Sequence, residues 1–332
     1  MDHIIELLSR ELDRPVQHVE NIVTLLDEGN TVPFIARYRK ELHGAMDDQL
    51  IRQLADRLQY LRNLQARRDE VKQSIENQGK LTEELSAAID AAATLAEVED
   101  LYRPYKQKRR TRATMAREKG LEPLAELAFA IGPAVDLEGA AADYIDPGKG
   151  VETVEDALQG ASDIVAEWIS DDADVRKLLR ELYWRRASIV SRAAAKEPED
   201  SVYRLYYEFS SPVSKTQGHQ ILAMNRGERE EILKVDVEMD RETALVALRR
   251  RAVPGRAAME FVRAAAEDAY DRLIAPSLER ELRGELTDRA SEGAIGQFAL
   301  NLKPLLMQPP VKGFVTMGLD PGYRMGCKVA VV

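Results

Sequence analysis

The amino-acid sequence predicts a mainly α-helical protein, a multi-lobed helical scaffold that ends in a short β-hairpin. Over most of the first 312 residues, apolar side chains recur at steps of three and four, as on the buried face of a helix. Residues 318–332 instead read as an apolar strand, an Asp-Pro-Gly turn and a second apolar strand. We expect these two strands to be the first hairpin of a truncated α/β domain.

The composition excludes several classes of protein. The chain has 332 residues, 45% of them hydrophobic and 31% charged, which suffices for a core and for helical surfaces. Its single cysteine, Cys327, has no partner for an intramolecular disulfide, which fits a reducing cytoplasm. No run of about 18 apolar residues occurs, and the acidic N-terminus is not typical of a secretory signal. We therefore predict a cytoplasmic protein without membrane contact.

Helix start and stop signals divide the first residues of the chain. The apolar periodicity predicts one helix over residues 3–12 and a second from Pro15 to Gly29. A third, short helix is expected over residues 31–41. Because a helix, a glycine turn and a short helix follow one another, this region is compatible with a helix-turn-helix-like element.

Asp47 opens the most regular helix of the sequence, which we predict over residues 48–77. Its apolar residues alternate at steps of three and four: Leu50, Leu54, Leu61, Leu64, Val71 and Ile75. A seam of this kind packs against a second helix. Gly79 and Thr82 predict an immediate return helix toward Ala96, so we expect an antiparallel helical hairpin rather than a dimeric coiled coil.

The elements predicted after residue 120 are shorter. Helices are expected at 121–131, 154–169, 174–191, 217–226, 256–282 and 285–302. Residues 231–239 alternate as in a strand, and residues 203–209 fit a strand or a helix. The charged loop at 196–200 marks the expected domain boundary.

The residues most suggestive of chemistry form the basic segment, defined here as residues 102–119. Eight cations and one acid give it a net charge of +7, in a chain whose net charge is −10. The cations are Arg103, Lys106, Lys108, Arg109, Arg110, Arg112, Arg117 and Lys119. Such side chains neutralise phosphates, and Tyr102 and Tyr105 are candidates for stacking on bases. The alternative is a basic loop that pairs with the acidic remainder of the chain.

Two other places carry candidate residues. Arg37, Arg39 and Lys40 face either phosphate or plain solvent. Asp320 is a lone carboxylate at a strand end, whereas two-metal nucleases need several carboxylates. We therefore expect Asp320 to form a turn and expect no catalytic activity. The four histidines lie far apart and no GxxxxGK loop occurs, so neither a metal site nor a cofactor is expected.

Three segments resemble the bacterial Tex family of transcription accessory proteins. They are TVPFIARYRKE, LYRPYKQKRRTRATMAREKGLEPLA and NLKPLLMQPPVKGFVTMGLDPGYRMGCKVAVV, which begin at residues 31, 101 and 301. The resemblance implies a helical N-terminal region with a helix-turn-helix-like element, an RNase H-like YqgF-type domain, and nucleic-acid binding in transcription. Asp320 matches the acidic first-strand position of that domain, whereas Met325 stands where threonine is usual. No enzymatic activity is carried over.

On this basis we expect three regions. They are a Tex-like helical domain with the hairpin and basic segment at 1–200, a second mostly helical, helix-turn-helix-like region at 201–312, and the first hairpin of a YqgF-type domain at 313–332. The predicted function is a scaffold that binds RNA or DNA, weakly in this chain, and acts in transcription. The alternative is a protein-interaction scaffold that docks on RNA polymerase, on the ribosome or on the rest of its own chain.

Overall fold

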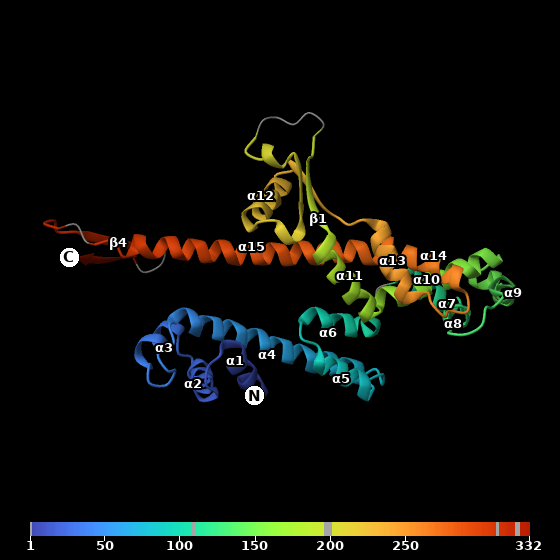
Figure 1. The fold of residues 1–332 in the computed structure, drawn as a ribbon, viewed down its shortest axis with the longest axis horizontal. Coiled ribbons are helices and arrows are strands. Elements are labelled where there is room, and N and C mark those ends of the chain that lie inside the picture. The colour runs from blue at the N-terminus through green and yellow to red at the C-terminus, as the bar shows by residue number, and fades with distance from the viewer. Residues whose placement is uncertain (1, 108–109, 196–200, 310–311, 323–325) are drawn as a thin grey trace. The chain divides into compact units, whose positions relative to one another are not determined.

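The computed structural model describes all residues except 1, 108–109, 196–200, 310–311 and 323–325 (Figure 1). Most of the described residues are helical, so the predicted mainly α fold is confirmed. The β-hairpin expected at the end of the chain is also present.

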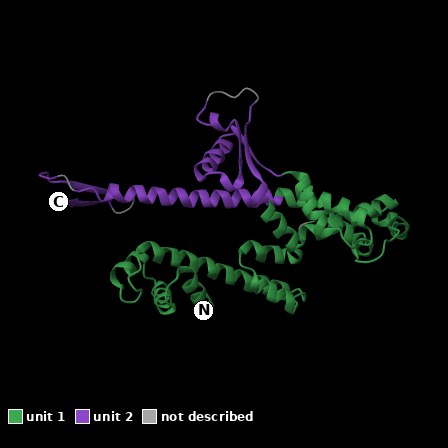
Figure 2. Cartoon of the chain, in the orientation of Figure 1, with its two compact units in different colours: residues 1–182, 240–276 green, residues 183–239, 277–332 purple. Residues whose placement is uncertain are grey.

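The chain divides into two compact units, each discontinuous in sequence. The first contains residues 1–182 and 240–276, and the second contains residues 183–239 and 277–332 (Figure 2). This division does not follow the predicted limits at 200 and 312, and the three domains stay predictions. The loop at 196–200 lies outside the described residues.

Four helices build the N-terminal part of the first unit. They are α1 (Asp2–Leu12), α2 (Val16–Asp27), α3 (Val32–Tyr38) and α4 (Asp48–Glu76). Leu8, Ile22, Ile35 and Leu54 are fully buried where these helices meet. The predicted elements are confirmed, except that α3 ends three residues before the predicted limit at 41.

After α4 the chain returns along it in two short helices, α5 (Glu83–Ala91) and α6 (Leu95–Tyr102). The antiparallel helical hairpin is therefore confirmed. Its helices start at side-chain caps: Asp47 accepts from the Leu50 N–H, Thr82 from the Leu85 N–H and Thr94 from the Glu97 N–H. The Thr94 cap explains a difference from the sequence, because it begins a new helix, α6, where a single return helix toward Ala96 was expected.

The buried face of α4 is wider than the predicted seam. Ile51 and Leu58 are buried as well as Leu54, whereas Leu50 is only half-buried. The helix therefore presents a broad apolar face, because it packs on α1, α2 and α3 along one half and on α5 and α6 along the other.

Helix α10 (Val154–Asp171) is the centre of the rest of the first unit. It contacts α7 (Arg112–Glu118), α8 (Glu122–Phe129), α9 (Leu137–Ala141) and α14 (Met259–Asp268), and α13 (Arg241–Ala252) packs on α14. The short turn η1 (Arg103–Tyr105) precedes α7 in the chain, η2 (Ala142–Tyr144) and η3 (Pro147–Lys149) lie between α9 and α10, and α11 (Ala173–Arg186) follows α10. Gly160 lets α8 approach α10 closely, because a Cβ there would lie 2.3 Å from Leu121 Cδ1. The helices expected at 121–131 and 154–169 are confirmed.

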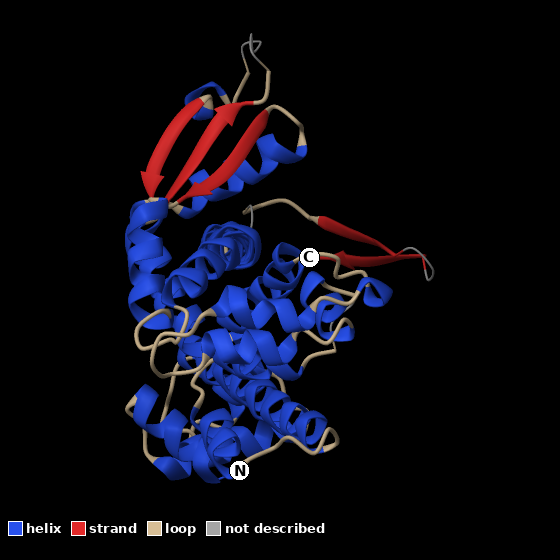
Figure 3. Cartoon of the chain, turned by 90° about the vertical axis from the view of Figure 1, so that its right-hand side faces the viewer, coloured by secondary structure: helices blue, strands red, loops and turns tan. Residues whose placement is uncertain are grey.

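The second unit holds a three-stranded antiparallel sheet (Figure 3). Its strands are β1 (Ser188–Ala193), β2 (Glu208–Pro212) and β3 (Leu233–Glu238), in the order β2-β1-β3, with the turns η4 (Arg204–Tyr206) and η5 (Val213–Lys215) nearby. Helix α12 (Gly218–Arg229) packs against β3. The strand expected at 231–239 is confirmed, but the helix expected at 174–191 is wrong beyond residue 186. There, α11 (Ala173–Arg186) ends and β1 begins.

Two predicted helix ends, at residue 226 and between residues 282 and 285, are wrong, and a glycine lies at each place. Gly227 lies inside α12, and a Cβ on it would lie 2.6 Å from Leu233 Cδ1, so glycine is required for the helix to approach β3. Gly284 lies inside α15 (Ala275–Leu306) with open space around it. The break predicted between residues 282 and 285 is therefore wrong. Helix α14, the π-helical segment η6 (Ala269–Ile274) and α15 instead form one continuous run.

The two halves of α15 differ in burial. Leu278, Leu282, Leu286 and Ala290 are buried at successive steps of four residues. Beyond residue 291 nearly every side chain is exposed. The chain then forms the hairpin of β4 (Met317–Gly322) and β5 (Gly326–Val331), whose described side chains are all exposed.

Candidate nucleic-acid interface

The basic segment contains the turn η1 and the helix α7. Thr111 caps α7, because its Oγ1 accepts a hydrogen bond from the Thr114 N–H and its own N–H donates to Thr114 Oγ1. Lys108 and Arg109, two of the eight predicted cations, lie outside the described residues. The other six fall into two groups, one held by protein partners and one facing solvent.

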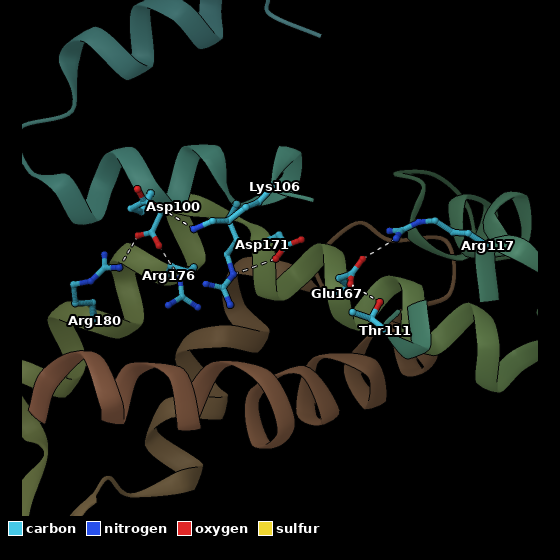
Figure 4. Close-up of polar contacts among 10 residues, drawn as sticks. Asp100, Lys106, Thr111, Arg117, Glu167, Asp171, Arg176 and Arg180 are labelled. Atoms are coloured by element: carbon cyan, nitrogen blue, oxygen red, sulfur yellow. Dashed lines mark hydrogen bonds and ion pairs between the residues drawn. The ribbon is translucent and has the colours of Figure 1, made fainter. Parts of the chain in front are cut away.

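The held group begins with Arg103 and Arg117, which face acids of α10. Figure 4 shows Arg117 beside Glu167. Arg103 Nε lies 3.2 Å from Asp171 Oδ1. Arg117 Nη1 lies 2.7 Å from Glu167 Oε2, and its Nε lies 3.1 Å from Glu122 Oε1. Burial alone lowers the pKa of Arg117, but the hydrogen bond that Arg117 donates to Glu167 and the charges of the nearby acids outweigh burial, so the pKa is raised. These two cations tie the segment to α10.

Lys106 and Lys119 are also engaged, at the surface. Lys106 Nζ lies 3.0 Å from Glu99 Oε2 and 5.8 Å from the centre of the Tyr102 ring. Lys119 Nζ donates to the Gly150 carbonyl at 2.7 Å. The Tyr102 ring is further contacted by Arg67, whose guanidinium carbon lies 5.5 Å from its centre. The predicted stacking of Tyr102 on a base therefore competes with two protein cations.

Arg110 and Arg112 form the solvent-facing group. The Arg110 side chain is 73% exposed, and its nearest acid is Glu118 at 3.8 Å. Arg112 is exposed, and its positive charge acts to lower the pKa of Asp163, against the effect of burial. Among the described cations of the basic segment, these two are the ones most open to a phosphate.

Next to Arg103 lies an ion cluster that the sequence analysis missed. Asp100 Oδ1 accepts from Arg176 Nε at 2.7 Å, and Asp100 Oδ2 accepts from Arg180 Nη2 at 2.6 Å (Figure 4). Asp100 is 5% exposed and Arg176 is 1% exposed. Arg176 and Arg180 lie 76 and 80 residues after Asp100 in the sequence, so no local sequence pattern indicates the cluster. It fixes α6 to α11.

A cavity of 620 Å³ opens beside the basic segment. It is lined by Lys80, Pro104, Lys106, Thr114, Arg117, Glu122, Glu167, Trp168, Asp171 and Asp172. The lining thus combines cations, carboxylates and one aromatic ring, and all of it belongs to the first unit.

The candidates near α3 occupy a different setting. Arg37 and Lys40 are exposed and line a hollow of 530 Å³ together with Asp47 and Asp48. Arg39 lies over the Phe34 ring, 5.2 Å from its centre. The two acids beside Arg37 and Lys40 weaken their attraction for phosphate.

The described residues offer no other chemical centre. Asp320 is exposed and lies opposite Lys328 in the hairpin. In the part of the chain that the structure describes, no group of three or more His, Cys, Asp or Glu could hold a metal ion. None of the described helices combines the length and apolarity needed to cross a membrane.

The helical hairpin, the α10 bundle and the partly exposed basic segment define a mainly α-helical protein, and its sequence matches two family models. Residues 2–76 match the family described as "Tex-like protein N-terminal domain", and residues 132–298 match "Tex central region-like". The chain belongs to the Tex family. The basic segment lies between the two matched regions.

Individual relatives agree with this assignment. The chain is 45% identical over 328 residues to protein YdcI of Bacillus subtilis, which covers 98% of this chain and 46% of that protein. It is 39% identical over 341 residues to the "Transcriptional accessory protein Tex" of Neisseria gonorrhoeae, covering 99% and 44%. It is 33% identical over 346 residues to human "S1 RNA-binding domain-containing protein 1", covering 99% and 34%. The chain thus spans less than half the length of these relatives.

Proposed function

We propose that this chain is a cytoplasmic helical scaffold that acts in transcription and binds nucleic acid weakly through the solvent-facing arginines of its basic segment. The names of the relatives support a role in transcription and contact with RNA. The observation that carries the proposal is the exposure of Arg110 and Arg112, in contrast to the acid-bound Arg103 and Arg117. Only a few cations are available, so affinity is low.

The binding is electrostatic and tolerates many sequences, because guanidinium groups at the surface contact phosphates rather than base edges. RNA and DNA single strands both present the required charge. The chain performs no catalysis in this proposal, since Asp320 stands opposite a lysine and not among other carboxylates.

The test compares two arginine variants in fluorescence anisotropy with a labelled single-stranded RNA at low salt. The double variant Arg110→Ala/Arg112→Ala is expected to lose most of the affinity. The control is Arg250→Ala, which removes one exposed arginine from α13. For two to four phosphate contacts, log Kd should rise with log salt with a slope of about 1.5 to 3. A parent that does not bind in low salt, or a double variant that binds like the parent, contradicts the proposal.

A second candidate function, docking of a protein, is favoured by the apolar residues beyond residue 290. Ile295, Phe298, Leu305 and Leu306 are 61–73% exposed on α15, and Leu319 and Val329 are 56–62% exposed on the hairpin. Large exposed apolar patches mark interaction sites. The partner in this reading is RNA polymerase, the ribosome or further Tex-family sequence.

This candidate is separable by experiment from the first. The variant Ile295→Ser/Phe298→Ser should abolish capture of purified RNA polymerase or ribosomes and leave RNA binding unchanged. The double arginine variant should do the reverse. Capture that survives the serine changes rules out this surface as the docking site.

A further inference from the structure

We infer that the 620 Å³ cavity beside the basic segment receives one base of a single-stranded nucleic acid, stacked on Trp168, while the flanking phosphates lie at Lys80 and Lys106. The inference rests on the proposed function and deepens it, because it names the form of the ligand and the place where it binds. Three features of the cavity carry it: a fixed aromatic wall, a cationic rim and an interior rich in acceptors.

The aromatic wall is Trp168 on α10. It is half-buried, lines the cavity and packs on Phe129 with a ring separation of 5.8 Å. Phe129 is in turn covered by Arg256, whose guanidinium carbon lies 3.7 Å from the ring centre and whose Nη1 donates to the Phe129 carbonyl. This stack of three groups holds Trp168 in one orientation. A held indole that still faces a cavity is a suitable platform for a base.

The cationic rim consists of Lys80 and Lys106. Lys80 is exposed, and the Lys106 side chain is 53% exposed despite its contact with Glu99. Both are long and strongly hydrated cations that neutralise phosphates at a surface. Arg110 and Arg112 belong to the same basic segment and add two exposed cations to those of the rim.

The interior of the cavity is unsuited to phosphate and suited to a base. Glu122, Glu167, Asp171 and Asp172 all line it, so a phosphate placed inside would meet four carboxylates and one guanidinium, that of Arg117, which is already paired with Glu122 and Glu167. A carboxylate has about four acceptor positions, so Glu122 retains acceptor capacity beside its ion pair with Arg117. Adenine, cytosine and guanine carry exocyclic amino groups that donate to such acceptors, and uracil does not.

The size of the cavity indicates whether a single-stranded or a double-stranded nucleic acid can enter it. Its volume lies within the range of about 300 to 1,000 Å³ found for small-molecule pockets, so one base fits. A base paired within a duplex would have to leave its stack to enter. Single strands with amino-bearing bases are therefore the expected ligand.

The experiment uses Trp168 as its own reporter. The chain has two tryptophans, so Trp184→Phe leaves Trp168 as the sole indole. Titration of this variant with a cytidine octanucleotide at low salt should quench the fluorescence, and a uridine octanucleotide should bind more weakly. Trp168→Leu, checked for native circular dichroism, should weaken cytidine binding by about 5- to 150-fold in anisotropy, the range for one stacked base.

A rim variant tests the site without disturbing the core. Lys80→Ala should weaken binding several-fold, whereas the control Arg250→Ala should not. If the octanucleotide binds but the Trp168 fluorescence does not change, or if Lys80→Ala binds like the parent, the cavity is not the site and only the proposed function stands. If no octanucleotide binds at all, the proposed function itself fails.

Discussion

The buried cluster around Asp100 and the exposed pair of Arg110 and Glu118 show how differently one charged region can use the same residue types. In the cluster, the Arg176 and Asp100 side chains are 2% and 7% exposed, and Arg176 Nε lies 2.7 Å from Asp100 Oδ1. In the exposed pair, the Arg110 and Glu118 side chains are 73% and 65% exposed, and Arg110 Nη2 lies 3.8 Å from Glu118 Oε2. The first arrangement holds helices together, and the second leaves a cation available to a ligand. Charge density along a sequence therefore does not measure a binding surface.

The largest effect that separates the two regions is expected from Asp100→Ala. Removal of one partner from a buried ion pair leaves the other charge uncompensated, which costs about 3–5 kcal/mol. Because Arg176 is 1% exposed, water cannot replace the lost carboxylate. Urea unfolding should report the loss in the free energy of unfolding. A loss below about 1 kcal/mol would mean that the cluster is not structurally different from a surface pair.

A smaller effect on stability should distinguish Arg117 from Arg112, both on α7. Arg117→Ala removes one hydrogen bond to Glu167, whose side chain is 10% exposed, and one to Glu122, and should cost about 2 kcal/mol of stability. Arg112→Ala should leave stability unchanged within about 0.5 kcal/mol and weaken RNA binding. Denaturant unfolding and anisotropy on both variants give the comparison. If both variants lose RNA affinity equally without loss of stability, the division into held and solvent-facing cations is wrong.

The sequence predicted those parts of the fold that local signals determine. Asp47 and Thr82 were read as helix starts, and both accept the expected backbone hydrogen bonds. The helix end predicted at residue 226, just before Gly227, was wrong because glycine has two uses. It ends helices, and it also permits close packing, here against Leu233, which is visible only in three dimensions.

The sheet and the ion partners depend on contacts far apart in sequence. Strand β1 (Ser188–Ala193) directly follows helix α11 and pairs with strands some twenty and forty-five residues away. Because these partners are not visible in the local sequence, the prediction extended the helix to residue 191. Arg103 and Arg117 were named as candidates, but their acids lie 68 and 50 residues further on. The sequence therefore located the charged region and not the division of roles within it.

An intermediate case, the pair of Glu97 and Lys177, should make stability depend on pH. The hydrogen bond from Lys177 and the backbone N–H of Ala93 hold the pKa of Glu97 below its ordinary 4.5, against the effect of burial. A carboxyl whose pKa is lower in the folded state stabilises it above the unfolded pKa, and this contribution disappears as the pH falls through the folded value. Stability should therefore decline below about pH 4.5. The decline should be shallower in Glu97→Gln, measured by thermal unfolding from pH 6 to pH 3.

Asp163 acts in the opposite direction and supplies the control. Burial raises its pKa, although Arg272 and Arg112 oppose that shift. A carboxyl with a raised pKa favours the folded state on acidification, so Asp163→Asn should make the acid decline steeper. If the two variants change the profile in the same direction, the assigned pKa shifts are wrong.

The smallest effect should come from Glu118→Gln, at the exposed end of the comparison. An exposed ion pair of 3.8 Å contributes little, so the free energy of unfolding should stay within about 0.5 kcal/mol of the parent. RNA affinity should rise slightly at low salt, because the change removes a negative charge that competes with phosphate for Arg110. The gain should vanish above about 0.15 M salt, where the Debye length falls to about 8 Å. Anisotropy at two salt concentrations measures it, and a loss of affinity would show that Glu118 orients Arg110 toward the strand rather than competing with it.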